Sequence, residues 1–485
     1  MTRCAARRAA ALCLLTAVGT VAAQTTPCRV DGIAIELRCG QVMRPLDPAR
    51  PGGATIAVHY VVVPATARRK RPDAVVLLAG GPGQSAIALA PAVLPLFARL
   101  NNRRDIVFVD QRGTGRSEAL ACDEPRRGPL AEQADLQAQE QRAIECRDRL
   151  ARRPSIGGVD GLRHFTTWIA SQDLEAVRQQ LGGIPLNLVG GSYGTRAALD
   201  YLRQFPQGVR RAVLDGVAPP DMVLPAAGSM DAQAVLDAVF AACAEEAACA
   251  RRYPTLRGDW DALLASLPKT VEVARPLTGQ AERLTLSRDL LLAWVRGPLY
   301  TPAVAAALPA TLHDAAHGRL QALVGLGALL EGRSRSPVAM GMHFSVVCAE
   351  DAPRMAQATD RPGADFGDGF AASYRRICAA WPRGAVPDAF YSLPRATVPV
   401  LLLSGGLDPV TPPRHGDRVA AALGPKARHV VVPRAGHGVL GIGCASDLLF
   451  RFIDAPDDAE ALALNAECVT RIPRPGAFLP ATGTP

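Results

Sequence analysis

A serine in a glycine-rich turn is the residue of this 485-residue chain that is best placed to do chemistry. Ser192 is the centre of G-x-S-x-G at residues 190–194, between an apolar run at 184–189 and a helical pattern at 195–205. Small neighbours let a strand turn sharply into a helix, which presents the serine hydroxyl to a substrate carbonyl. The setting predicts a catalytic nucleophile; the alternative is a glycine-rich turn that merely caps the helix.

A serine hydroxyl becomes a good nucleophile when a histidine takes its proton and an acid orients that histidine. Asp408 follows a predicted strand at 398–403, and His437 follows one at 429–432, so both should project at the edge of the sheet where the serine lies. Of the eight histidines, His437 alone is flanked by glycines directly after a C-terminal strand, and His415 is its competitor. Asp408 precedes a proline, so a turn-forming role stays open for it.

Acyl transfer also needs two backbone N–H donors for the oxyanion. Tyr193 directly follows the serine and would supply the first. The glycine-rich segment at 80–85 follows an early predicted strand, and Gly81 is the expected second donor. A phosphate loop is excluded there because no Lys-Ser/Thr pair ends the glycines.

The elements that position these residues alternate between strand and helix. Strands are predicted at 55–64, 74–79 and 105–110 and a helix at 167–181, which indicates a mostly parallel sheet covered on both faces. From 221 to 394 apolar residues recur at helical spacing, which indicates a mainly helical insertion. The predicted organisation is a signal peptide at 1–23, a first core part at 24–220, a lid insertion at 221–394 and a second core part at 395–485.

Three motifs carry a family resemblance: Gly-Gly-Pro-Gly at 80–83, Asp-Gln-Arg-Gly-Thr-Gly-Arg-Ser at 110–117 and Gly-Gly-Ser-Tyr-Gly-Thr at 190–195. Together they resemble the proline iminopeptidase and tripeptidyl aminopeptidase family of α/β-hydrolase serine peptidases. The secreted tripeptidyl-aminopeptidase branch is more similar still, through residues 173–178, 214–217, 348–351 and the segment with Asp408 and His437.

The resemblance spans residues 50–470 and is weakest over 221–340. It implies an α/β-hydrolase fold, with a mostly parallel sheet flanked by helices and a large, mainly helical lid insertion. One departure is Ala79, which stands where proline iminopeptidases usually carry a histidine before the glycines. That position lies outside the triad, so the departure weakens the narrower assignment and leaves the mechanism unchanged.

The first residues predict export. Arg3, Arg7 and Arg8 precede an apolar run at 9–18 and small residues before Gln24, the pattern of a cleaved secretory signal. No later stretch reaches the roughly 18 uninterrupted apolar residues that a membrane span requires. A periplasmic or secreted protein without a membrane span is therefore expected.

The chain has twelve cysteines, of which Cys4 and Cys13 would leave with the signal. An even set of ten in an oxidising compartment predicts disulfides. Sequence proximity suggests the pairs Cys28 with Cys39, Cys122 with Cys146, Cys243 with Cys249, Cys348 with Cys378, and Cys444 with Cys468. Without a C-x-x-C pair or a histidine at ligand spacing from a cysteine pair, no metal site and no cofactor are predicted.

The formal charge of +9 comes mainly from scattered arginines. Their densest run, at 68–71, is interpreted as a solvated loop, because binding to nucleic acid needs a contiguous basic face. No nucleic-acid partner is expected, and the sequence does not indicate an oligomeric state.

The expected function is that of an exported serine aminopeptidase releasing amino-terminal residues or tripeptides from peptides with a free amino terminus. Such an enzyme must hold an ammonium group, and Glu350 and Asp351 are its candidate anchors; a solvated acidic turn is the alternative for them. A carboxylesterase or lipase with the same triad is a second hypothesis. A non-catalytic binding protein on a hydrolase scaffold is a third.

Overall fold

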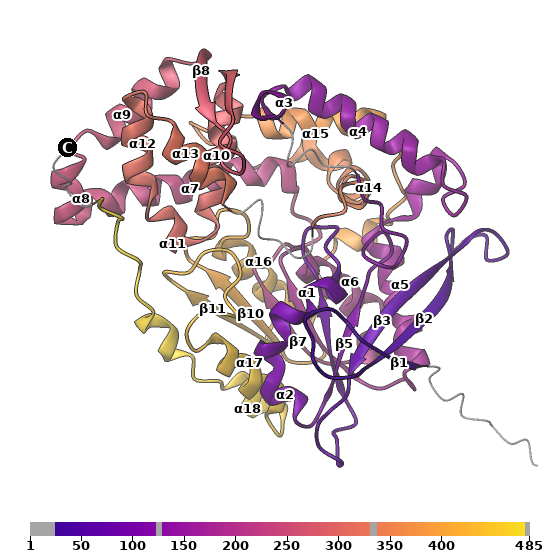
Figure 1. Ribbon diagram of the computed structural model, residues 1–485. Coiled ribbons are helices and arrows are strands. Elements are labelled where there is room, and N and C mark those ends of the chain that lie inside the picture. Colours follow the sequence, from indigo (N-terminus) through magenta and orange to yellow (C-terminus); the bar gives the residue numbers. More distant parts are fainter. Residues whose placement is uncertain (1–24, 123–128, 330–336, 481–485) are drawn as a thin grey trace, which may run out of the picture.

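The computed structural model describes residues 25–122, 129–329 and 337–480, and a nine-stranded sheet lies at its centre (Figure 1). The predicted signal at 1–23 lies outside the described residues. The three strand pairs from β1 to β5 are antiparallel, and the pairs from β5 to β11 are parallel. In sheet order the strands are β1 (Thr26–Cys28), β2 (Leu37–Pro45), β3 (Thr55–Val63), β5 (Asp105–Val109), β4 (Ala74–Leu78), β6 (Leu186–Gly191), β7 (Val209–Asp215), β10 (Val400–Gly405) and β11 (Ala427–Val432).

Alternating apolar side chains bury both faces of this sheet. In β5, Ile106 and Phe108 belong to one apolar cluster, while Val107 and Val109 belong to the other, as expected from the two-residue period of a strand. The first cluster is covered by α1 (Ala86–Val93), α2 (Ala98–Asn101), α17 (Ala445–Asp454) and α18 (Asp458–Leu462). The second is covered by α5 (Thr167–Gln180), α6 (Tyr193–Gln204) and α16 (Pro413–Leu423). The sheet with helices on both faces is the layered arrangement that the sequence predicts.

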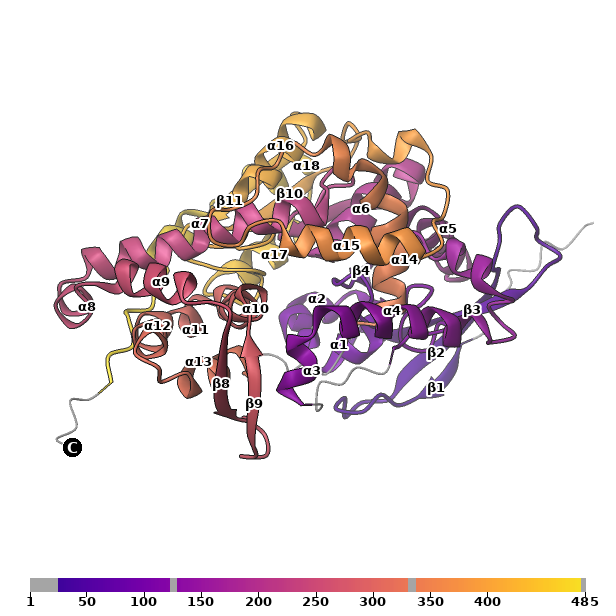
Figure 2. The same ribbon diagram turned by 90° about the horizontal axis from the view of Figure 1, so that it is seen from above.

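The segment between β7 and β10 builds a helical body, most of which packs around an apolar core at Trp260, while its last two helices share a second cluster with Tyr193 of α6. Seen from above, α8 to α13 gather on one side with a β-hairpin, while α14 and α15 lie toward α4 (Leu136–Ala151) (Figure 2). The hairpin was not expected, because the sequence pattern indicated a mainly helical insertion and no strand within it. In chain order the elements are α7 (Leu224–Glu245), α8 (Ala247–Arg252), α9 (Leu256–Ala265), β8 (Lys269–Ala274), β9 (Ala281–Leu286), α10 (Arg288–Leu299), α11 (Pro302–Ala305), α12 (Leu308–Ala316), α13 (Gln321–Ala328), α14 (Met340–Glu350) and α15 (Gly369–Ala380).

A second piece of chain joins this helical body. Helices α3 (Leu130–Ala134) and α4 (Leu136–Ala151) fall within the range predicted for the core, yet Leu150 of α4 shares an apolar cluster with Phe344 and Ile377 of the insertion. The carboxylate of Glu282 in β9 also accepts the backbone N–H of Leu130 at 2.6 Å. The helical body outside the sheet layers is therefore built from two segments of the sequence: α3 with α4, and the insertion between β7 and β10.

Five disulfides cross-link the described residues, and they join the pairs expected from sequence proximity. Cys348–Cys378 ties α14 to α15, and Cys122–Cys146 ties the segment that follows β5 to α4. Disulfides of this number are typical of oxidising compartments. Among the described residues no helix is both long and apolar enough to cross a membrane.

Candidate active site

Ser192 occupies the turn between β6 and α6, and its backbone is strained. Its φ of 55° and ψ of −124° belong to a region that residues other than glycine rarely adopt. Such backbone costs about 1–3 kcal/mol and persists where the surroundings fix it. The lack of a side chain at Gly194 lets the start of α6 pack closely against β4 and so holds the turn in place. A Cβ at Gly194 would lie 2.0 Å from the carbonyl oxygen of Leu78 in that strand. The half-buried serine is thus held at the end of a buried strand, as the sequence predicts.

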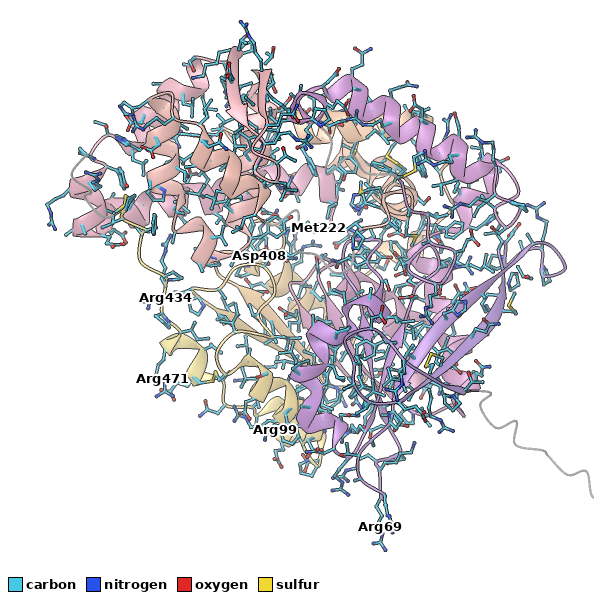
Figure 3. All side chains as sticks on the ribbon, in the orientation of Figure 1. Arg69, Arg99, Met222, Asp408, Arg434 and Arg471 are labelled. Carbon is cyan, nitrogen blue, oxygen red and sulfur yellow. A yellow bond between two sulfur atoms is a disulfide. The ribbon has the colours of Figure 1, made fainter. Side chains whose placement is uncertain are left out.

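Asp408 and His437 meet at the carboxyl ends of β10 and β11. Nδ1 of His437 lies 2.8 Å from Oδ2 of Asp408. The other carboxylate oxygen accepts the backbone N–H groups of Val410 and Thr411, each at 2.9 Å. Asp408 is fully buried where the insertion meets the sheet (Figure 3), whereas the His437 side chain remains 16% exposed. The acid is therefore fixed, and its partner histidine stays accessible.

The His437 ring lies beside the elbow. The backbone N–H of Ser192 donates to the carbonyl of Asp215 at 2.8 Å, which pairs the elbow with the end of β7. A Cβ on the following residue, Gly216, would lie 3.3 Å from Cε1 of His437. The serine, the histidine and the acid are thus brought to one edge of the sheet from three separate loops.

Two further residues support the histidine, and the sequence did not single them out for this role. The hydroxyl of Thr411 donates to Asp408 at 2.8 Å and lies 3.1 Å from Nδ1 of His437. The carboxylate of Asp215 accepts the backbone N–H groups of Val439 and Leu440, at 2.9 and 3.0 Å, and so holds the loop after the histidine. Thr411 is a polar residue three positions after Asp408, the aspartate of the Asp-Pro turn, and this spacing is the signal that would have indicated it.

The charges around His437 favour its protonated form. Burial disfavours the imidazolium, but the carboxylates of Asp408 and Asp215 outweigh it, so the pKa of His437 lies above its ordinary value. Burial likewise disfavours ionised Asp408, yet the histidine and the two backbone N–H donors hold the pKa of this carboxyl below its ordinary value. Asp408 is therefore an anion over the whole neutral range and stabilises a charged His437.

The raised pKa predicts a specific pH profile. If His437 must be neutral to accept a proton, activity should rise as the pH increases through the pKa of His437. We expect the acid limb of kcat/KM for a small ester to have its midpoint above 6.5, the ordinary histidine value. A profile measured from pH 5 to 9 checks this, and a midpoint below 6.5 would contradict the electrostatic argument.

The loop after β4 lies against the elbow. A Cβ on Gly80 would stand 3.2 Å from Cβ of Ser192, and Gly81 has a φ of 112°, which favours glycine. On the other side, Tyr193 is the first residue of α6, where backbone N–H groups have no partner within the helix. The two residues expected to bind an oxyanion thus lie on the two segments that adjoin the serine.

A second Asp-His-Ser relay occurs in the same half of the sheet. Nδ1 of His429 lies 2.8 Å from Asp417, and Nε2 lies 3.0 Å from the hydroxyl of Ser404. Ser404 is fully buried inside β10, and the Asp417 side chain is 69% exposed. Because Ser404 is fully buried, a substrate cannot reach that hydroxyl.

His415, the competing base, lies elsewhere. Its side chain is 2% exposed, and Nε2 is 3.2 Å from the carboxylate of Asp231 in α7. The histidine thus fastens α16 to the insertion and is not the partner of Asp408.

The structure argues against Glu350 and Asp351 as anchors for a substrate amino terminus. Both side chains are buried and paired with the guanidinium of Arg196 in α6, at 3.3 and 3.0 Å. Glu350 also accepts the N–H and hydroxyl of Thr167, and Asp351 accepts the N–H of Leu224. Burial raises the pKa of Glu350 to about 7 against the opposing charge of Arg196. The carboxylates lack the exposure that an arriving ammonium group needs, because an internal arginine already pairs with them.

The insertion reaches the histidine directly. The carbonyl of Tyr300, at the end of α10, accepts the backbone N–H of His437 at 2.9 Å. The two rings also meet edge to face, with centroids 5.3 Å apart. Sequence patterns gave no sign of this contact, because the two residues are far apart in the chain.

Comparison with known proteins places this arrangement in a family. The family described as "alpha/beta hydrolase fold" matches residues 73–251, and the one described as "TAP-like protein" matches residues 363–460. Carboxylesterase B from Mycobacterium tuberculosis is 30% identical over 424 residues, which cover 80% of this chain and 78% of that protein. The chain belongs to the α/β-hydrolase family. The resemblance and the fold class expected from the sequence are thereby confirmed.

Two further relatives of this hydrolase are named as peptidases. Serine protease Hip1 from Mycobacterium tuberculosis is 26% identical over 442 residues, covering 82% of each chain. Tripeptidyl aminopeptidase from Streptomyces lividans is 32% identical over 192 residues, covering 38% of this hydrolase and 36% of that protein. Ser192 lies within the first matched family region, and Asp408 and His437 lie within the TAP-like region.

Proposed function

We propose that the protein is an exported serine exopeptidase that releases amino-terminal residues or tripeptides from peptides. Ser192 is the nucleophile, His437 the general base and acid, and Asp408 the residue that orients His437. The backbone N–H groups of Gly81 and Tyr193 bind the oxyanion.

The proposed reaction has two halves. Ser192 Oγ attacks the scissile carbonyl carbon while its proton passes to Nε2 of His437, and Asp408 stabilises the resulting imidazolium. The tetrahedral intermediate collapses when the C–N bond breaks and His437 gives the proton to the leaving amine. A water molecule then attacks the acyl-enzyme by the same proton route, which releases the acid product and restores Ser192.

The buried Asp408 carboxylate on Nδ1 of His437, beside the elbow, is the observation that carries this proposal. It fixes the histidine tautomer whose Nε2 can accept a proton. The peptidase assignment is supported by the TAP-like region and by the relatives named as a protease and an aminopeptidase. Export is supported by the five disulfides.

A carboxylesterase is the second candidate, because the relative with 30% identity over most of the chain carries that name. The same catalytic groups cleave esters and amides, so the residues around Ser192 do not separate the two. The difference lies in the substrate that the insertion admits.

Matched substrates separate these functions. We expect a tripeptidyl nitroanilide with a free amino terminus to be cleaved about tenfold to a hundredfold more efficiently than its acetylated form, the range expected for losing a hydrogen-bonded charge. Measuring kcat/KM for both peptides and for a nitrophenyl butyrate tests this. Equal rates on free and blocked peptides would remove the exopeptidase function, and cleavage of the ester alone would leave the esterase. Inactivity toward every substrate would favour a binding protein.

A further inference from the structure

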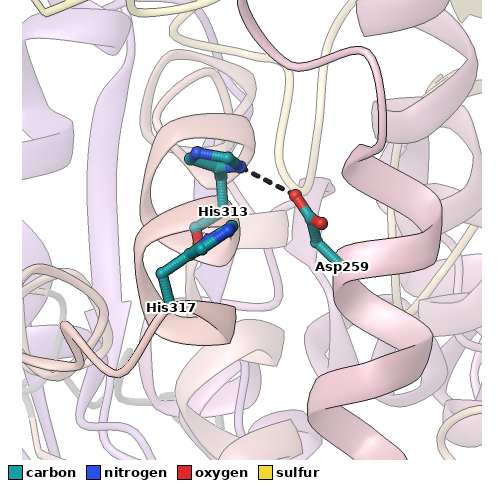
Figure 4. Close-up of side chains that lie close together, drawn as sticks. All are labelled: Asp259, His313 and His317. Carbon is teal, nitrogen blue, oxygen red and sulfur yellow. Dashed lines mark hydrogen bonds and ion pairs between the residues drawn. The ribbon is translucent and has the colours of Figure 1, made fainter.

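The insertion carries a cluster of metal-binding side chains outside the proposed active site. Asp259 of α9, His313 of α12 and His317, which caps the C-terminal end of α12, each offer one ligand atom, and the three atoms lie within 4.8 Å of one another (Figure 4). We propose that these residues bind one divalent transition-metal ion, with zinc as the best match, and that the ion fastens α9 to α12.

The spacing of the two histidines gives the site its geometry. Residues four apart lie on the same face of a helix, one turn above the other, so both rings can reach one ion. Imidazole nitrogens and a carboxylate oxygen are ligands that zinc accepts, at about 2.0–2.2 Å from the ion. Asp259 comes from a second helix, and the three donors therefore bridge two elements (Figure 4).

Neighbouring hydrogen bonds already orient the donors. Nδ1 of His317 lies 2.8 Å from the carbonyl of His313, which directs Nε2 of His317 away from the helix. The hydroxyl of Thr255 donates to Oδ1 of Asp259 at 3.1 Å and so holds the other carboxylate oxygen toward His313. Support of this kind around the ligands fixes their orientation and is typical of metal sites in proteins.

The contact between Asp259 and His313 shows where the ion would enter. Tetrahedral ligands about 2.1 Å from zinc lie about 3.4 Å apart. The present 2.7 Å between oxygen and nitrogen is a direct hydrogen bond, so these two side chains must separate slightly to admit the ion. His317 is exposed, and the fourth position is therefore open to water from solvent.

The spacing of the cysteines predicted no metal site, and cysteine spacing cannot reveal a site built from histidines and an aspartate. All ten cysteines in the described residues form disulfides and have no thiolate to offer. The relevant signal was the H-x-x-x-H spacing at 313–317, whose acidic partner lies about fifty residues earlier.

Titration with zinc tests the proposal. The full chain, without a histidine tag, is treated with a chelator, desalted and titrated with Zn²⁺ in a calorimeter. We expect one ion per chain, and at least about tenfold weaker binding by each of His317→Ala and Asp259→Asn. Added zinc should raise the melting temperature of the original protein and leave that of His317→Ala nearly unchanged.

His429→Ala provides the matched control, because His429 pairs with a single carboxylate and has no second histidine in its contact with Asp417. It should bind zinc as tightly as the original protein. His317 is exposed, so its replacement leaves the helix packing intact, and circular dichroism verifies the fold of each variant. Zinc affinity that is the same in both cluster variants as in the original protein, or no binding up to millimolar zinc, would overturn the proposal.

Discussion

Replacing Ser192 with alanine should lower turnover of a nitrophenyl ester by about 10⁴-fold to 10⁶-fold while leaving the fold intact. In the proposed mechanism the hydroxyl oxygen of Ser192 forms the acyl-enzyme, so its removal eliminates the nucleophile. His437→Ala should have an effect of the same size, because the base and the nucleophile act as one unit. Single-turnover and steady-state rates, measured with matched circular dichroism spectra, check this result.

The second Asp-His-Ser relay supplies the control for this experiment. Ser404→Ala removes a buried hydroxyl that is hydrogen-bonded to His429. We expect it to lower the free energy of unfolding by about 1 kcal/mol without lowering kcat. His429→Ala should likewise keep its activity. Loss of turnover in Ser404→Ala, with activity retained in Ser192→Ala, would assign the chemistry to the other serine.

Asp408→Asn should lower kcat by about 10⁴-fold. The side-chain oxygen of an asparagine would still accept the N–H groups of Val410 and Thr411, which turns its NH₂ group toward Nδ1 of His437. That contact favours the tautomer with its proton on Nε2, and such a histidine cannot accept the proton of Ser192. Binding of substrate should change little, so the loss should appear in kcat far more than in KM.

Asp417→Asn is the matched control for this change. Its carboxylate also lies 2.8 Å from a histidine Nδ1, but it is exposed and belongs to the relay whose serine is buried. We expect activity within twofold of the original protein, in line with the small contribution of exposed pairs, about 0 to 1 kcal/mol. Equal losses in Asp408→Asn and Asp417→Asn would show that Asp408 has no special role.

The parts of the site that follow from the sequence are those defined by local patterns. The apolar run before Ser192 and the glycines around it specify a strand, a turn and a helix within about twenty residues. The disulfide pairs could be anticipated for the same reason, since the joined cysteines are 6 to 30 residues apart. In both cases the interacting residues are neighbours in the chain.

The parts that the sequence did not reveal depend on partners far away in the chain. Glu350 suggested a free acid near the site, but Arg196, which pairs with it, lies 154 residues earlier. The hairpin of β8 and β9 was missed because its strands pair only with each other, at one side of a helical body. A pattern that reports burial along one segment contains no information about such partners.

The bond between the insertion and the histidine loop has a consequence for how this enzyme can diversify. The carbonyl of residue 300 and the N–H of residue 437 are both main-chain groups, so the bond does not depend on the identity of either side chain. Side chains of the insertion can therefore change while this main-chain contact with the loop of His437 is kept. The sequence of the insertion can vary within such a lineage without moving the main chain at His437.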